Sequence, residues 1–75
     1  MLKGGINMNY IITEIQTTGG VTTVVTPVIK NTEAEAWQAF HQACAYAAVS
    51  GLDIHTVVIE NAEGFQIERK CFKTI

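Results

Sequence analysis

Four residues of the chain have side chains that commonly bind metals or act as nucleophiles: His41, Cys44, His55 and Cys71. Two histidines and two cysteines can form a tetrahedral zinc site. In a helix, residues three positions apart, such as His41 and Cys44, lie on one face. The remaining spacings lack the short paired intervals of known zinc motifs. We therefore expect no metal site and no cofactor.

Catalysis would require a nucleophile with a base within reach, and Cys44 with His41 is the one local pair of that kind. Cys44 falls in the apolar stripe of a predicted helix, and an apolar environment raises the pKa of a thiol. The 7 acidic residues are scattered over caps, turns and strands, and no phosphate-binding glycine loop is present. We expect no catalytic residues and no enzymatic activity.

Three cations gather near the end of the chain: Arg69, Lys70 and Lys73. They are a candidate anion patch for a nucleotide or a phosphate. Alternatively, charged residues on an edge strand prevent further strands from pairing with it, and this interpretation is favoured. The formal net charge of −2 gives no electrostatic reason to expect nucleic acid or an anionic membrane as a partner.

The elements that would position these residues follow from the periodicity of apolar side chains. Residues 10–17 alternate and predict a strand, and the glycine-containing segment 18–20 predicts a tight turn. Residues 21–30 predict a second strand that is rich in Val and Thr. Pro27 cannot donate a ladder hydrogen bond, so this strand should be at an edge or bulged. Its core face should carry Val21, Val25 and Ile29.

A helix is the clearest predicted element. Thr32 and Glu35 fit a capping box at its start, and Gly51 provides the stop signal after its last turn. At 100° per residue, a set of apolar side chains forms one stripe that should lie on the sheet. The stripe comprises Ala36, Trp37, Phe40, Ala43, Cys44, Ala47 and Ala48.

The opposite face of this helix has few charges, and Glu35 is its only acid. A fully solvated helix face normally has more charge, and small residues allow another surface to approach closely. This face is therefore a candidate interface, most simply with a second copy of the chain. Its residues are Gln38, Gln42, Ala45, Tyr46 and Val49.

Two further strands complete the fold. Residues 53–61 are apolar on both faces and predict a central strand, residues 61–64 predict a hairpin loop, and residues 65–72 predict the last strand. The class is α+β, with a ββαββ order and a four-stranded, mainly antiparallel sheet that has one helix packed on one face. The preferred strand order is second, first, third, fourth.

The chain of 75 residues predicts a single domain. Met8 is a second candidate start, so we expect residues 1–7 to be a translated leader or a disordered arm and residues 8–75 to be the ββαββ domain. No apolar run is long enough for a membrane span or a secretory signal. We expect a cytoplasmic location with no membrane partner.

One helix can cover only one face of the sheet. We expect Tyr10 and Ile12 on the other face, together with part of the Val and Ile set. An uncovered apolar face of this kind marks an interaction site. A chain this small also has a marginal core. We therefore expect a homodimer.

Several segments from Met8 onward carry a resemblance, namely residues 10–17, residues 34–36 with His41, residues 47–50, residues 63–65 and residues 71–72. Through them the chain resembles small uncharacterised proteins of phages, prophages and other mobile elements of gut Firmicutes. The resemblance implies a bacterial or phage cytoplasmic setting, but no known activity and no catalytic residue. Proteins of that kind often act by binding a host component.

Together these patterns predict a small non-enzymatic protein-interaction module of phage or prophage type, which acts as a homodimer on a host or phage protein. The alternative is a small-ligand binding protein that holds a nucleotide or an anion on Arg69, Lys70 and Lys73 in the groove of the dimer.

Overall fold

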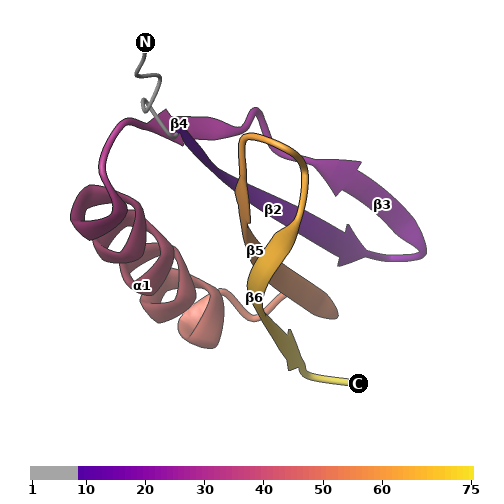
Figure 1. Ribbon diagram of the computed structural model, residues 1–75. Coiled ribbons are helices and arrows are strands. Elements are labelled where there is room, and N and C mark those ends of the chain that lie inside the picture. The colour runs from indigo at the N-terminus through magenta and orange to yellow at the C-terminus, as the bar shows by residue number, and fades with distance from the viewer. Residues whose placement is uncertain (1–8) are drawn as a thin grey trace, which may run out of the picture.

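The computed structural model describes residues 9–75, which form one antiparallel sheet of five strands with one helix against one of its faces (Figure 1). The predicted α+β class and ββαββ order are confirmed. The prediction for residues 1–7 lies outside the described residues. The elements are β2 (Tyr10–Thr18), β3 (Val21–Val24), β4 (Val28–Lys30), α1 (Glu33–Val49), β5 (Ile54–Asn61) and β6 (Gln66–Lys73).

Strand β2 pairs with β3 and then β4 along one side and with β5 along the other, and β5 also pairs with β6. This is the predicted order. The predicted second strand, residues 21–30, is divided into β3 and β4 around Pro27, which lacks the N–H that a continuous ladder needs. Within the break, Val25 N donates a 2.9 Å hydrogen bond to Glu14 O.

The register shows which face of the sheet the helix covers. Ile12 pairs with Ile59, and both side chains are buried under α1 beside Phe40. The prediction that Ile12 lies on the uncovered face is wrong, since it is only 3% exposed. Tyr10 shares that side of β2 and packs against the same core, so its predicted placement is wrong too. Ile11 and Ile15 on one face of β2 are as apolar as Tyr10 and Ile12 on the other, and alternation alone could not tell the two faces apart.

The helix begins as its cap pattern predicts, because Thr32 Oγ1 accepts a 3.2 Å hydrogen bond from Glu35 N. It ends at Ser50, and Gly51 follows with φ +73°. Most of the predicted stripe faces the core: Ala36, Phe40 and Ala47 are buried, and Trp37, Ala43 and Cys44 pack against them. Ala48 is exposed, so its predicted place in the stripe is wrong.

Two of the three residues predicted to face the core from the β3–β4 edge are exposed. Val25 is half-buried, whereas Val21 and Ile29 are 65% and 61% exposed. Ile29 pairs with Ile11 on the face that α1 does not cover, and Val21 lies beside the turn at the far end of β2. Their predicted place in the core is therefore wrong. Among residues 9–75, no helix is long and apolar enough to cross a membrane.

Candidate functional site

The four metal-binding or nucleophilic residues of the sequence lie apart in the fold. His41 is exposed on α1, where its ring stacks on Trp37 with centroids 5.6 Å apart. Cys44 is half-buried and packs against the core, whereas Cys71 is exposed on β6. Within residues 9–75, no three His, Cys, Asp or Glu side chains come together as a metal site.

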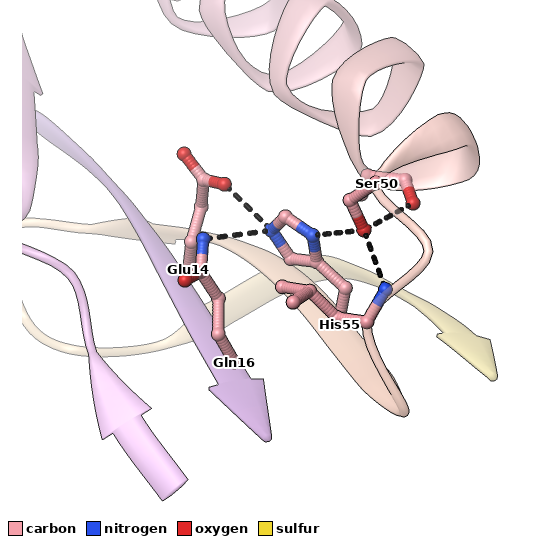
Figure 2. Close-up of polar contacts among 6 residues, drawn as sticks. Glu14, Gln16, Ser50 and His55 are labelled. Atoms are coloured by element: carbon pink, nitrogen blue, oxygen red, sulfur yellow. Dashed lines mark hydrogen bonds and ion pairs between the residues drawn. The ribbon is translucent and has the colours of Figure 1, made fainter. Parts of the chain in front are cut away.

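His55 is a buried residue whose ring bridges β2 and the end of α1 (Figure 2). Its Nε2 lies 2.8 Å from Glu14 Oε1, and its Nδ1 lies 3.0 Å from Ser50 Oγ. Gln16 Nε2 lies 3.5 Å from the same Nε2, at the outer limit of hydrogen bonding. Both ring nitrogens therefore have a partner. A hydrogen-bond network from Glu14 through His55 to Ser50 joins the helix to the sheet.

The protons of this network can be arranged in two ways. A neutral ring with its proton on Nε2 donates to Glu14 and accepts the hydroxyl proton of Ser50 at Nδ1. A charged ring donates to both partners, and the Ser50 hydroxyl then turns to Ala47 O, which lies 3.1 Å away. Every buried side-chain N or O atom of the described residues has a partner. Each polar atom of the Glu14–His55–Ser50 network therefore has a hydrogen-bond partner whether the ring is neutral or charged.

Serine, histidine and a carboxylate also compose catalytic triads, but this arrangement has two features that oppose acyl transfer. Ser50 lies at the C-terminal end of α1, where the last carbonyls carry a partial negative charge that disfavours an oxyanion. Neither cleft that adjoins α1 is lined by Ser50 or His55. We interpret the Glu14–His55–Ser50 network as a clamp that holds the helix against the sheet. The absence of catalysis stays a prediction.

Replacing Ser50 by alanine should destabilise the protein by about 1–3 kcal/mol, because the buried Nδ1 of His55 loses its partner. Ser50→Thr keeps the hydroxyl and should remain close to wild type. Thr26→Ala, at an exposed position, serves as the control for loss of a surface hydroxyl. Urea denaturation measures all three, and equal midpoints for Ser50→Ala and wild type would contradict the clamp.

A cleft of about 250 Å³ lies between α1 and the strands β2 and β4. A smaller cleft of about 150 Å³ adjoins it and shares Lys30, Ala39 and Gln42 with it. The larger cleft has an apolar floor, and charged and polar groups line it as well. Its lining is Ile12, Glu14, Val28, Lys30, Ala39, Gln42, Ala43 and Tyr46.

The residues that sequence analysis placed on the outer helix face are all exposed in the single chain. Gln42 and Tyr46 line the larger cleft and Gln38 lines the smaller one. Ala45 and Val49 line neither cleft. The predicted interface on α1 is thus partly the wall of a cleft.

The predicted basic cluster is divided between the two faces of the sheet. Lys70 pairs with Val57 and lies on the helix side, whereas Arg69 pairs with Val58 and Lys73 with Ile54 on the uncovered side. Lys73 lies four positions after Arg69, which is about 13 Å along the strand. The structure therefore does not bring the three cations together as one anion patch, because the pleat of a strand alternates its side chains.

The uncovered face of the sheet is formed mainly by Ile, Val and Thr. Cross-strand pairs place Ile15 with Val24, Ile11 with Ile29, and Thr13 with Val58 on this side. Val24 and Ile29 are 62% and 61% exposed. The side of the sheet that α1 does not cover thus carries Ile11 and Ile15 in place of the predicted Tyr10 and Ile12. Val58 on this side is only 8% exposed, and Glu60, Arg69 and Lys73 lie on it as well.

Burial raises the pKa of the Cys44 thiol above its ordinary value of 9.0. The ammonium of Lys70 opposes this shift, whereas the carboxylates of Glu14 and Glu68 add to it. At pH 8 the thiolate form of Cys44 is consequently a minor species, and the direction of the shift is the one predicted from the apolar stripe.

Alkylation should distinguish the two thiols. At pH 8, iodoacetamide should modify Cys71 rapidly, because Cys71 is exposed, and should modify Cys44 at least tenfold more slowly. Mass spectrometry of the Cys44→Ser and Cys71→Ser variants assigns each rate. The Cys44 rate should still be rising above pH 9, since the raised pKa shifts thiolate formation upward. Equal rates at pH 8 would contradict the buried environment of Cys44.

No protein-family model, no curated protein and no solved structure matches the chain. The resemblance to phage and mobile-element proteins therefore stays a prediction, as does the cytoplasmic location.

Proposed function

We propose that the protein is a non-enzymatic interaction module that acts as a homodimer joined through the uncovered face of its sheet. The observation that supports this proposal most is the apolar composition of that face, which includes the exposed side chains of Val24 and Ile29. Burying apolar area is worth roughly 25 cal/mol per Å². A second copy offers an equally apolar surface.

The size of the face supports a reversible dimer. Strand β2 has 9 residues, which at about 3.3 Å per residue gives a length of roughly 30 Å. Four strand widths of about 4.8 Å give roughly 19 Å. Two such faces would bury about 1,100 Å² in total, slightly below the roughly 1,200–2,000 Å² of stable specific interfaces and typical of weak, transient ones. We therefore expect a dissociation constant in the micromolar range.

The charges on this face favour a second copy as the occupant. Glu60 pairs with Ile11 near one end of the sheet, and Lys73 pairs with Ile54 at the other end. A two-fold axis that runs across the strands in the plane of the interface reverses one copy end for end. Glu60 of one copy then lies near the partner's Lys73. The two ends of the face are therefore complementary to each other, whereas Arg69, which pairs with Val58 on the same side, lies near the same residue of the partner.

Val24→Lys should weaken association at least tenfold, because dimerisation would remove an unpaired ammonium from water. Val24 is 62% exposed in the single chain, so the substitution should leave the fold intact. Val49→Lys is the matched control, since Val49 is 81% exposed at the end of α1. Sedimentation velocity over a concentration range measures both. A monomeric wild type, or disruption by Val49→Lys alone, would overturn the proposal.

Charge reversal tests the symmetry of the dimer. Glu60→Lys and Lys73→Glu should each weaken association a few-fold, because each places like charges opposite one another at the rim, where one ion pair is worth about 0.2–1 kcal/mol. The double variant should recover most of the wild-type affinity, and high salt should reduce the weakening caused by each single variant. Additive weakening in the double variant would show that the two residues do not meet.

A dimer joined in this way would leave both helices on its outer surfaces. The face formed by Gln38, Gln42, Ala45, Tyr46 and Val49 would then be accessible to the host or phage protein that the module is proposed to bind. The alternative, an anion-binding protein that uses Arg69, Lys70 and Lys73, has less support because the three side chains do not converge.

A further inference from the structure

The larger cleft combines an apolar floor with one acid and one base. Ile12 and Val28 from the sheet and Ala43 from α1 line it, together with the side chains of Glu14 and Lys30. Its volume of about 250 Å³ lies below the roughly 300–1,000 Å³ of sites for drug-sized ligands. A ligand of this cleft is therefore small and has an apolar part.

The acid of the cleft is held in place by a buried group. Glu14 Oε1 lies 2.8 Å from His55 Nε2, and His55 is in turn held by Ser50 Oγ (Figure 2). The Glu14 side chain is still 27% exposed, so it can meet a ligand while His55 fixes its orientation. A carboxylate fixed in this way binds a cation at a low cost in side-chain ordering.

The base of the cleft lies toward the opposite end of its wall. Lys30 pairs with Tyr10, four residues before Glu14 along β2, which corresponds to about 13 Å between the two backbone positions. Within the described residues, Lys30 has no carboxylate within salt-bridge distance. Both side chains line the same cleft as the apolar floor. The cleft thus offers an anion for a cationic group and a cation for an anionic one.

We propose that this cleft binds a free amino acid with an aliphatic side chain. The ammonium of the amino acid would donate to Glu14, its carboxylate would accept from Lys30, and its side chain would pack on Ile12, Val28 and Ala43. The cleft is on the helix side of the sheet, opposite the face assigned to the dimer. The two proposals are therefore independent of each other.

L-leucine is the probe for this site, and isothermal titration with the full chain measures its binding. We expect a dissociation constant of about 1 mM, as is typical of so small a ligand. Leucinamide lacks the carboxylate and N-acetylleucine lacks the ammonium, so each should bind at least tenfold more weakly. Absence of saturable leucine binding, or equal binding of the blocked forms, would overturn the proposal.

Variants localise the binding to the cleft. Lys30→Met removes the ammonium but keeps an apolar stem, and it should weaken leucine binding at least tenfold. Ala43→Leu fills the floor of the cleft and should abolish binding, with circular dichroism to verify the fold. Lys73→Met, on the uncovered face, is the matched control and should bind as wild type does. Unchanged binding by Lys30→Met and Ala43→Leu would contradict the site.

The dimer variant separates the two proposals. Val24→Lys should bind leucine with wild-type affinity even where it is monomeric, because Val24 is outside the lining of the cleft. Loss of leucine binding in that variant, with its fold retained, would contradict a cleft that is complete within one chain.

Discussion

The fold depends on the ratio of one helix to one sheet. A sheet has two faces, and one helix of 17 residues covers one of them. Each face of an antiparallel sheet is buried against another element or meets water. In this chain the helix-side core is anchored by Phe40, Val57 and Ile59, all of which are fully buried. The other face remains rich in β-branched side chains, which a second copy of the chain would remove from water.

Local pattern was sufficient to predict the elements, because caps, turns and alternation are properties of neighbouring residues. Thr32 and Gly51 mark the helix ends, and Pro27 marks the edge strand. The choice of face was not predictable in this way. Ile11 and Ile15 on one side of β2 are as apolar as Tyr10 and Ile12 on the other. Packing across several strands decides which side of β2 meets the helix. A short stretch of sequence does not contain the residues of those other strands.

The hydrogen-bond network of Glu14, His55 and Ser50 could not be predicted from the sequence for a related reason. Glu14 and His55 are 41 positions apart, and they meet only because the register sets His55 opposite Gln16, which makes Glu14 its diagonal neighbour on the same face. A partial signal existed, since alternation placed His55 on the same side as Val57. The same register also divides Lys70 from Arg69 and Lys73. Adjacency in sequence indicated a cluster there, whereas the pleat of β6 separates it.

The buried histidine links the stability of the fold to the character of the cleft. An apolar residue at position 55 would enlarge a small core, whereas a buried imidazole costs desolvation that its partners must offset. Those partners are the end of α1, through Ser50, and Glu14 on β2. The histidine therefore fixes the position of the helix end and the direction of a carboxylate that lines the cleft. Apolar packing alone could hold the helix end in place. It could not orient a partly exposed carboxylate, as His55 does for Glu14. This difference is the physical reason to regard the helix side of the sheet as more than a core.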